Sequence, residues 1–388
     1  MASVTKRAYD SGSIRQKGRG WQIRYRKDGQ RKYEQVNGTF KLAEKVLRER
    51  LVAIEKGEYV GKKKLTTSAY LQDWLETYAV TNCTAKTVQG YKQSINCYTA
   101  AIAGITLQKL DASHIQPIYA GMIKRGLSNR TADALHKALS IALNTAIKQG
   151  ILKRNPLDNV IAPKVAKKEV EVWDAEMRAK AMTVLKGSQY GDFYQLGLMT
   201  GMRRGELAGL KWANVNLANK QLQVVNTLQR ITGQGLMNGQ PKTERSRRSI
   251  ALSTDTVALL HEIRGKQMTQ QLEVVDAWTD SGYVFTSADG MPVDPNLATR
   301  AFKKVLASAG LPKLTIHGLR HTHATILLEQ GVNPKVVSER LGHASVATTM
   351  DIYSHVLPDM QEKAALAIDA ALAPISEASD LRLISRRS

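Results

Sequence analysis

The sequence predicts a multidomain fold that is mainly α-helical and carries small β elements. The chain has 388 residues, which is enough for two or three domains that each bury a core. Strand-like alternation is confined to a few short segments, whereas helical spacing of apolar residues dominates beyond residue 66. Two basic segments, 61–64 and 162–168, have the composition of linkers. The expected parts are a small sheet with one helix (1–60), a helical domain (66–160), a mixed α/β domain (170–373) and a flexible tail (374–388).

The charge balance points to a polyanionic partner. Lys and Arg number 56 against 34 Asp and Glu, which gives a formal net charge of +22. Residues 1–64 contain 18 Lys or Arg against 7 Asp or Glu, an excess of 11 and therefore half of the net charge. Such an excess attracts nucleic acid or an anionic membrane surface, although a basic surface can also serve solubility alone. Nucleic acid is the leading partner class.

The other bulk properties indicate a soluble, cytoplasmic protein. The two cysteines, Cys83 and Cys97, are too few for a disulfide framework and lack the spacing of a metal site. No apolar run approaches the ~20 residues that cross a bilayer. The residues after Met1 soon turn basic and contain no apolar core of a signal peptide.

The first domain is expected to be a basic sheet packed on one helix. Trp21, Ile23 and Tyr25 alternate with polar residues, which gives a strand one apolar face and one basic face. The dipeptide at 28–29, Asp-Gly, is typical of a tight hairpin turn before a second strand at 31–36. Such a sheet fits a major groove, and the alternative is a solvated edge sheet whose charges prevent aggregation. The candidate DNA contacts are Arg24, Arg26, Lys27, Arg31 and Lys32.

Helical spacing of apolar residues marks one helix in the first domain and four in the second. The helix at about 41–55 is expected to bury Leu42, Val46, Leu47, Leu51 and Ile54. The four helices of the second domain are expected at 69–78, 86–98, 113–125 and 129–149. Gly126 separates the last two, and Gly150 is placed to cap the fourth. The sequence of this domain points to no particular chemistry.

The third domain contains the first polar cluster with a chemical interpretation. Its strands are expected at 222–228, 249–252 and 283–286. The segment TGMRRGE joins two helices, with Gly201 allowing a tight turn between them. Arg203 therefore lies at a helix start, where anions are favoured. A structural ion pair with Glu206, three residues further on, is the alternative use of this arginine.

The tetrapeptide HGLR, from His317 to Arg320, opens a further helix. These two residues are three positions apart, so both side chains can reach one phosphate. Arginine offers a planar fork of donors to oxyanions, and histidine can move a proton near neutral pH. A helix-capping histidine and a salt-bridged arginine are the alternative interpretation.

The histidines that surround this motif also permit a metal site. His317 and His321 have the i, i+4 spacing of a helical zinc pair, and His343 is a further candidate ligand. The pair lacks the accompanying Glu and an obvious third ligand nearby. We therefore expect no metal, and we expect His321 and His323 to pack or to make supporting hydrogen bonds.

Tyr353 and Lys242 complete the candidate catalytic side chains. The segment LGH ends one helix at His343, and Tyr353 follows ten residues later in an apolar helix. Such a tyrosine usually packs in a core, but nearby guanidinium groups would favour its phenolate and a base would take its proton. Lys242 lies in a polar loop, from which a lysine can protonate a leaving oxygen. The loop also carries arginines up to Arg248, which leaves plain DNA-backbone binding as the alternative.

Together these residues resemble the tyrosine recombinase, or phage integrase, family. The match covers about 170–365 and contains the family's six elements in order. They are Arg203 in TGMRRGE, Lys242 in PKT, His317 and Arg320 in HGLR, His343 in LGH, and Tyr353. Residues 66–160 are similar to the helical core-binding domain of such enzymes. Residues 1–60 look like the small arm-binding domain found in integrases of temperate phages and integrative elements.

The resemblance implies a site-specific DNA recombinase that integrates and excises a mobile element. Tyr353 would attack the scissile phosphate, giving a 3′-phosphotyrosyl link and a free 5′-hydroxyl. His317 would accept the tyrosine proton, and Lys242 would protonate the leaving 5′-oxygen. The charge on the phosphate oxygens would be stabilised by Arg203, Arg320 and His343. The resemblance implies no cofactor.

The implied partners are double-stranded DNA with attachment sites, further copies of the chain in a tetramer on that DNA, a host DNA-bending protein and an excision factor. The implied location is the host bacterial cytoplasm. The amphipathic stretch at 360–372 is suited to docking on a neighbouring protomer or to packing on its own domain. A type IB-like topoisomerase is the alternative with nearly the same active site, and the separate N-terminal sheet argues against it. A non-catalytic DNA-binding regulator gives no reason for the ordered set of six residues.

Overall fold

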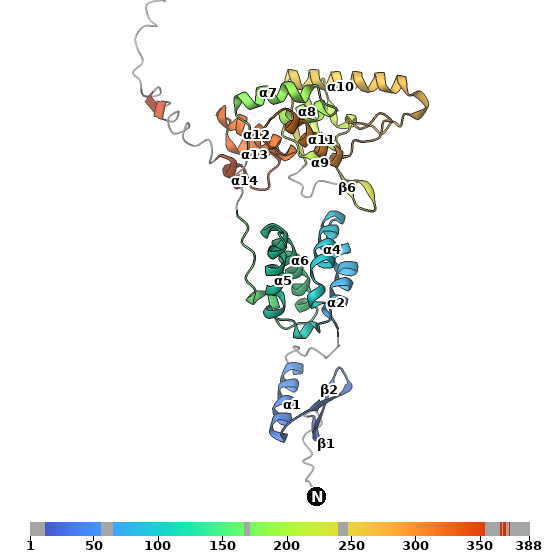
Figure 1. Cartoon of the computed structure of the whole chain (residues 1–388), viewed down its shortest axis with the longest axis vertical. Helices are drawn as coiled ribbons and strands as arrows, with labels where there is room; N and C mark the ends of the chain where they lie inside the picture. Colours follow the sequence, from blue (N-terminus) through green and yellow to red (C-terminus); the bar gives the residue numbers. More distant parts are fainter. Residues whose placement is uncertain are drawn as a thin grey trace, which may run out of the picture. The chain divides into compact units, whose positions relative to one another are not determined.

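The computed structural model describes residues 12–55, 65–166, 171–239 and 247–353, together with 365–366, 368–369 and 372. The chain divides into two compact units, Met1–Lys167 and Lys168–Ser388 (Figure 1). The first unit contains two separate hydrophobic cores, one built around Ile23 and Leu47 and one built around Trp74 and Leu139. Helices dominate both units and the sheets are small, so the predicted fold class is confirmed.

A three-stranded antiparallel sheet opens the described chain. Its strands are β1 (Ser13–Lys17), β2 (Gly20–Lys27) and β3 (Gln30–Val36), in the order β1-β2-β3. Asp28 and Gly29 both have positive φ, +49° and +74°, as the expected tight hairpin turn requires. Strand β1 was not expected, because its sequence SIRQK contains a single apolar residue and therefore no alternation. It forms by pairing along the open edge of β2.

Helix α1 (Phe40–Glu55) covers one face of this sheet. Leu47 is buried as expected, and Val46, Leu51 and Ile54 pack partly against the core. The expectation for Leu42 is wrong, since this side chain is 42% exposed and Ala43 is buried in its place. The small alanine lets the helix backbone lie close to the sheet, and the packed face is turned accordingly.

The second core lies within a bundle of helices. These are α2 (Thr67–Trp74), α3 (Val80–Asn82), α4 (Ala85–Tyr98), α5 (Ala112–Lys124) and α6 (Asn129–Lys148). A π-helical turn at Leu75–Ala79 joins α2 to α3. A Thr, Asp or Ser side chain accepts a backbone N–H at the start of α2, α4, α5 and α6, as is typical of helix N-caps. The four expected helices are confirmed, and Gly126 and Gly150 both adopt the positive φ of helix-ending glycines.

The second unit is a helical assembly with two small sheets. Its helices are α7 (Ala175–Lys186), α8 (Gly191–Thr200), α9 (Arg204–Ala208), α10 (Thr254–Glu273), α11 (Pro295–Ser308), α12 (Ile316–Glu329), α13 (Pro334–Leu341) and α14 (Val346–Tyr353). Its strands are β4 (Val215–Asn216), β5 (Gln221–Val224), β6 (Thr227–Ile231), β7 (Gly235–Gly239) and β8 (Arg248–Ala251). Helix α8 is buried along most of its length and packs against α7, α10 and α12. Figure 1 shows α12, α13 and α14 gathered beside α8.

The strand predictions in this unit are partly wrong. The single strand expected at 222–228 is two strands of different sheets, because β5 pairs with β4 and β8 whereas β6 pairs with β7. The run at 283–286 makes only isolated bridges, Lys211 to Tyr283 and Thr286 to Pro292. Its apolar residues are buried in the core without a neighbouring strand, and burial alone produces the same sequence pattern. The expected strand at 249–252 is confirmed as β8.

Two further expectations concern membranes and cysteines. No helix of the described segments combines the length and the apolar character needed to cross a membrane. Cys83 is half-buried and Cys97 is exposed, and neither forms a disulfide.

Candidate active site

Arg320 is the buried centre of the candidate site. Its side chain is 1% exposed, and Nη1 donates to the Gly201 carbonyl at 2.8 Å while Nη2 donates to the Leu341 carbonyl at 2.6 Å. These carbonyls lie at the C-terminal ends of α8 and α13, where the helix dipole is negative and favours a cation. Burial lowers the pKa of Arg320 to about 9, which still leaves the guanidinium charged at neutral pH. The direct hydrogen-bond partners of this buried positive charge are therefore carbonyls at two helix ends, and Glu206 stabilises it only through its nearby negative charge.

Two glycines make this geometry possible. Gly201 caps α8 and Gly342 caps α13, and both have a φ of +66°, which glycine adopts without strain. A Cβ on Gly201 would lie 2.6 Å from Leu341 Cδ2 and 2.7 Å from His323 Cδ2. Glycine at 201 is therefore required both for the turn and for the close approach of α13 and α12.

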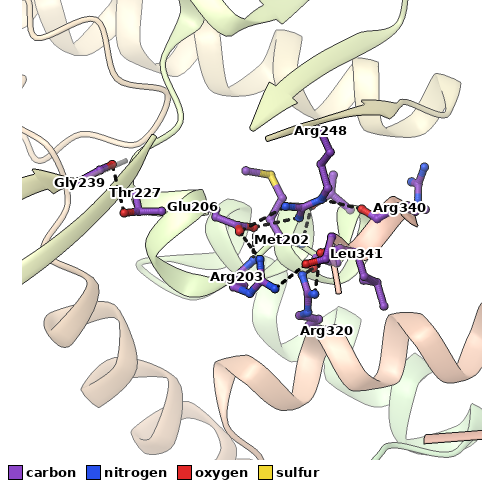
Figure 2. A network of polar contacts seen from close by, with 12 residues as sticks. Met202, Arg203, Glu206, Thr227, Gly239, Arg248, Arg320, Arg340 and Leu341 are labelled. Carbon is purple, nitrogen blue, oxygen red and sulfur yellow. Dashed lines mark hydrogen bonds and ion pairs between the residues drawn. The ribbon is translucent and has the colours of Figure 1, made fainter. Parts of the chain in front are cut away.

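Arg203 lies at the start of α9 and is held by one carboxylate and one carbonyl (Figure 2). Its backbone N–H donates to Glu206 Oε2 at 2.9 Å, and its Nη1 donates to Glu206 Oε1 at 2.7 Å. Nη2 donates to the Gly342 carbonyl at 2.8 Å. The structural ion pair considered from the sequence is therefore present, yet the Arg203 side chain remains 36% exposed. Arg203 combines a fixed position with a partly exposed side chain.

Glu206 is a buried carboxylate shared by two arginines. Its side chain is 1% exposed, and Arg248 donates from Nη2 to Oε2 at 2.9 Å and from Nη1 to Oε1 at 3.3 Å. Burial alone would raise the pKa of Glu206, but the hydrogen bonds and charges of Arg248 and Arg203 outweigh it and hold this pKa below its usual value. The carboxylate is therefore ionised at neutral pH and partly offsets the arginine charges.

His317 and His343 flank these arginines. The Thr315 hydroxyl accepts the Gly318 N–H at 3.0 Å, which places His317 in the first turn of α12. Desolvation, followed by neighbouring positive groups, lowers the pKa of His317 to about 4. Desolvation and then the charges of Arg320 and Arg203 lower the pKa of His343 to about 3. Both imidazoles are neutral at pH 7, so each can accept a proton or donate from one ring nitrogen.

The hydrogen bonds of His323 determine its tautomer. His323 Nδ1 lies 2.8 Å from the Leu198 carbonyl, and Arg340 Nε donates to His323 Nε2 at 3.2 Å. A carbonyl only accepts, so Nδ1 carries the proton and Nε2 is the acceptor. The supporting hydrogen bonds expected of His323 are confirmed.

The ring of His321 packs against that of His317 as expected, with the centroids 4.7 Å apart and the planes at 89°. The buried Nδ1 of His321 has no hydrogen-bond partner in the described parts of the chain. Over the same residues, no three His, Cys, Asp or Glu side chains are grouped as ligands of a metal ion.

The structure gives the side-chain positions of four of the six candidate catalytic residues, and Tyr353 and Lys242 are the other two. Tyr353 is the last residue of α14, which packs against α12 and α13, and its side chain lies outside what the structure describes. Lys242 belongs to the stretch 240–246, which is outside the described residues. The structure brings together the other four candidates, which are Arg203, His317, Arg320 and His343.

The N-terminal sheet divides the five candidate DNA contacts between its two faces. Residues directly opposite on antiparallel strands project to the same face, and Arg26 is opposite Arg31. Arg24 shares this face, because it lies two residues before Arg26. These three side chains are exposed on the face away from α1. Arg15 of β1 is on the same face, where its Nε donates to Gln22 Oε1 at 2.8 Å.

Lys32 and Lys27 lie on the other side of that sheet. Lys32 is opposite Tyr25, which is buried on the side covered by α1. Lys27 lies two residues after Tyr25 and therefore projects to the same side. Lys32 Nζ donates to Gln30 Oε1 at 3.0 Å, and Lys27 Nζ is 3.9 Å from Asp28 Oδ2. The sequence pattern alone did not separate these two lysines from the three arginines.

The structure brings Arg248 and Arg340, neither of which the sequence assigns to the catalytic set, close to the candidate site. Arg248 donates from Nε to the Arg340 carbonyl at 2.7 Å, and Arg340 Nη1 donates to the Ala251 carbonyl at 3.0 Å. Together with Glu206 they form the polar network of Figure 2. The available signal was the run of basic residues directly before β8, which also suits plain DNA-backbone binding.

Comparison with known proteins places the two larger parts of the chain in one family. The model of the phage integrase family matches residues 174–360, and that of the phage integrase SAM-like domain matches residues 66–165. A tyrosine recombinase XerC-like protein of Caldanaerobacter subterraneus is 29% identical over 345 residues, which span 84% of this chain and 88% of that protein. The ICEBs1 integrase of Bacillus subtilis is 29% identical over 270 residues, spanning 69% of this chain and 72% of the relative.

Solved structures share the fold at lower identity. The integrase of the Tn1549 transposon, in complex with a circular intermediate DNA, has a TM-score of 0.65 and 20% identity, covering 78% of this chain and 99% of that one. A lambda integrase tetramer bound to a Holliday junction has a TM-score of 0.57 and 18% identity, covering 89% and 96%. The matched sequence families, the relatives and the shared fold lead to one conclusion: this chain belongs to the phage integrase family and is a tyrosine-type site-specific recombinase.

Proposed function

We propose that this recombinase cuts and rejoins DNA through a covalent bond between Tyr353 and a 3′-phosphate, and that it thereby integrates and excises a mobile element. The observation that carries the proposal is the convergence of Arg203, His317, Arg320 and His343, from separate segments of the chain, on one site. Tyr353 ends α14, a helix that packs against the two helices on either side of this site, α12 and α13. A phosphoryl-transfer site needs this combination of fixed positive charge, a proton acceptor and a nucleophile.

Negative charge on the phosphate oxygens is stabilised by three side chains. Arg203 is held by Glu206 and by a carbonyl, and its side chain is still 36% exposed, which leaves room for a phosphate to bind. Arg320 adds its charge from the interior, fixed by two helix ends. His343 Nδ1 lies 2.8 Å from the Thr349 hydroxyl. If that hydroxyl donates, Nε2 of His343 carries the ring proton and can donate it to a phosphate oxygen.

The neutral state of His317 suits it to accept a proton during the reaction. A bond forms between the Tyr353 oxygen and phosphorus, and the bond from phosphorus to the 5′-oxygen breaks. His317, neutral in the free protein, takes the phenol proton, and the negative phosphate beside it makes the imidazole more basic than it is without DNA. Lys242 gives a proton to the leaving 5′-oxygen. Rejoining runs these steps in reverse with a new 5′-hydroxyl, and the phosphotyrosyl bond conserves the energy of the broken bond.

The domains and partners are assigned on the same basis. We assign residues 1–60 to arm-type DNA sites, 66–160 and 170–373 to the core site and its cleavage, and 374–388 to a tail. The protein would act in the bacterial cytoplasm on double-stranded attachment sites, as a tetramer, with a host DNA-bending protein and an excision factor. The lambda integrase tetramer on a Holliday junction supports the tetramer. Docking of 360–372 on a neighbouring protomer is supported by Leu366, Ile368 and Leu372, which are 61%, 60% and 77% exposed.

The decisive experiment uses an attachment-site duplex with a nick that traps the cleaved strand. Wild type and Tyr353→Phe are compared without added metal, and Tyr190→Phe, another tyrosine of the second unit, serves as the matched control. We expect a covalent, protease-sensitive protein–DNA band with wild type and with Tyr190→Phe. We expect none with Tyr353→Phe, which should still bind the duplex. A covalent band with Tyr353→Phe would show that another residue is the nucleophile.

The same preparations separate the alternative functions. Efficient relaxation of a supercoiled plasmid that lacks attachment sites would indicate a type IB-like topoisomerase. Specific binding to attachment sites with neither cleavage nor relaxation would indicate a non-catalytic regulator.

A further inference from the structure

Three arginines converge on three consecutive carbonyls at the end of α13. Arg248 Nε donates to the Arg340 carbonyl at 2.7 Å, and the carbonyls of the next two residues bind the arginines of the candidate site. Arg320 Nη2 donates to the Leu341 carbonyl at 2.6 Å, and Arg203 Nη2 donates to the Gly342 carbonyl at 2.8 Å. Figure 2 shows the three arginines around Arg340 and Leu341. These carbonyls are at the C-terminal end of α13, where the helix dipole is negative. The next residue in the chain is the candidate catalytic His343.

Arg248 differs from Arg203 in the hydrogen bonds of its guanidinium and in the exposure of its side chain. All three of its nitrogens donate to protein acceptors, Nε to the Arg340 carbonyl and Nη1 and Nη2 to the two oxygens of Glu206. Its side chain is 6% exposed, against 36% for Arg203. A guanidinium that is buried and bound in this way is not presented to a DNA phosphate. Plain DNA-backbone binding, the alternative considered for this basic segment, therefore does not suit Arg248.

We propose that Arg248 is a positioning residue for the recombination reaction. It joins β8 to Glu206 of α9 and to the end of α13, and through these two contacts it holds Arg203 and the carbonyls that orient Arg320. Arg248 is also the first residue of β8 and lies six residues after Lys242 in the chain. The inference rests on the proposed function, because it assigns Arg248 to the same reaction.

Only a planar fork of donors can make these contacts together. A lysine at 248 would keep the positive charge, but a single ammonium cannot reach both oxygens of Glu206 and the Arg340 carbonyl with the geometry of a guanidinium. Glu206 would then be free to turn, and Arg203 would lose its fixed partner. Displacing a catalytic group by about 1 Å can cost on the order of 100-fold in rate.

The test compares Arg248→Lys with wild type in the full chain. Single-turnover cleavage of the nicked duplex at saturating protein gives the rate of the bound complex, and the dissociation constant is measured over a series of salt concentrations. We expect the cleavage rate to fall by roughly 10- to 100-fold. We expect the slope of log affinity against log salt to stay unchanged, because Arg248 neutralises no phosphate.

A matched control guards against a general loss of stability. Arg178 Nη1 donates to Glu329 Oε2 at 3.1 Å and to the Trp173 carbonyl at 3.4 Å, so it also joins a carboxylate and a carbonyl of the second unit. Arg178→Lys should cleave at the wild-type rate. The melting temperature of each variant shows whether the protein remains folded at the assay temperature.

A double-mutant cycle with Glu206→Gln tests the proposed route of action. If Arg248 acts through Glu206, the two substitutions remove one unit, and the double variant should lose no more cleavage than the worse single variant. The comparison remains informative if Arg248→Lys lowers the melting temperature. A loss of stability alone would not make the loss of cleavage in the double variant equal to that of the worse single variant.

Three results would overturn the inference. The first is a salt slope that falls by about 1 in Arg248→Lys with unchanged cleavage of bound DNA, which would make Arg248 a phosphate contact. The second is a loss of cleavage as large in Arg178→Lys as in Arg248→Lys. The third is a double variant whose loss is the product of the two single losses. Failure of the proposed function is distinguishable, since it would show itself as a covalent band that persists in Tyr353→Phe.

Discussion

Four histidines of the second unit are held in the neutral form by their surroundings. His317, His321, His323 and His343 all have a lowered pKa, with desolvation as the largest cause in each case. The neighbouring arginines act in the same direction, because a second positive charge beside them is unfavourable. The same burial that suits His317 to accept a proton makes the site sensitive to acid.

The contribution of His323 to this acid sensitivity can be measured as a change in the free energy of unfolding with pH. Its pKa is about 4 in the folded protein, against about 6.5 in an unfolded chain, so unfolding takes up a proton between these two values. The stabilisation is complete above pH 6.5 and is lost as the pH falls toward 4. At pH 5 the loss from this residue is about 2 kcal/mol. Calorimetry at pH 7, 6 and 5 should show a falling melting temperature for the second unit.

The control for that prediction is His323→Asn. The amide nitrogen can replace Nδ1 as the donor to the Leu198 carbonyl, and the side chain does not titrate. The variant should lose less stability than wild type between pH 7 and 5. Equal losses in the two proteins would mean that His323 does not contribute to the acid sensitivity.

Gly201 is required for two reasons, its left-handed backbone conformation and the close packing of Leu341 and His323 against it. Gly201→Ala would place a side chain in left-handed backbone, at a cost of about 1–2 kcal/mol, and would press its Cβ against Leu341 and His323. Gly331→Ala has the same backbone cost, with a φ of +77°, but no atom lies within 4 Å of the added Cβ. We expect Gly201→Ala to lose roughly 1–3 kcal/mol more than Gly331→Ala. We also expect only Gly201→Ala to slow cleavage, because the Gly201 carbonyl holds Arg320.

Urea unfolding of the two alanine variants gives the free energies, and the nicked-duplex assay gives the rates. Equal destabilisation of the two variants would mean that the surrounding side chains yield to the added methyl group. The close approach at Gly201 would then not be a requirement of the site.

At the scale of elements, helix ends and sheet faces assign roles to charged residues. The C-terminal ends of α8 and α13 supply carbonyls to Arg203, Arg248 and Arg320, so a cluster of cations is stabilised with Glu206 as the carboxylate among them. In the N-terminal sheet the strand register separates arginines from lysines. Helix dipole and strand parity thus decide which basic side chains are held by the fold and which are exposed on the outer face of the sheet.

The two faces of the sheet can be compared with equal changes in charge. Arg24→Ala/Arg31→Ala removes two cations from the outer face, and Lys27→Ala/Lys32→Ala removes two from the side of α1. We expect the arginine pair to weaken binding to arm-type DNA and to lower the salt slope by about 2. The lysine pair should have a smaller effect on both. Binding titrations at several salt concentrations check this, and equal effects would mean that net charge rather than the face determines binding.

At the scale of the whole molecule, the N-terminal sheet and α1 have a hydrophobic core of their own. Its core around Ile23 and Leu47 is a different cluster from the core around Trp74 and Leu139. We therefore expect each core to persist without the other. A chain that lacks residues 1–60 should keep its remaining helices.

We expect this deletion to divide DNA binding into two parts. Without residues 1–60, affinity for distal arm sites should fall, because the basic sheet is gone, while affinity for the core site and covalent cleavage should persist. Competition binding with separate arm and core duplexes checks the first part, and the nicked duplex checks the second. An equal loss of affinity at arm and core sites would contradict the assignment of 1–60 as the arm-binding domain.

Local patterns were sufficient where a single element sets the outcome. The Asp28-Gly29 turn follows from backbone preferences, and the ends of α6 and α13 follow from glycines that alone adopt left-handed φ without strain. The pairing of His317 with Arg320 on one side of α12 follows from helical spacing. Each motif of the family is a short stretch of consecutive residues, and the motifs follow one another in a fixed order along the chain. For this reason the catalytic part could be recognised without a structure.

What only the tertiary structure decided involves contacts between distant segments. Arg248 meets Glu206 across 42 positions and the Arg340 carbonyl across 92, and no local pattern encodes such pairs. The strand expected at 222–228 divides because its two halves find different partners. Arg31 and Lys32 project to opposite faces as neighbours in a strand, and only the pairing of β3 with β2 places Lys32, opposite Tyr25, on the side of α1. Propensity and periodicity act over a few residues, so the sequence by itself determined most of the helices and the motif. Packing between distant segments decided how the strands pair, and it decided that Arg248 is buried whereas Arg203 stays partly exposed.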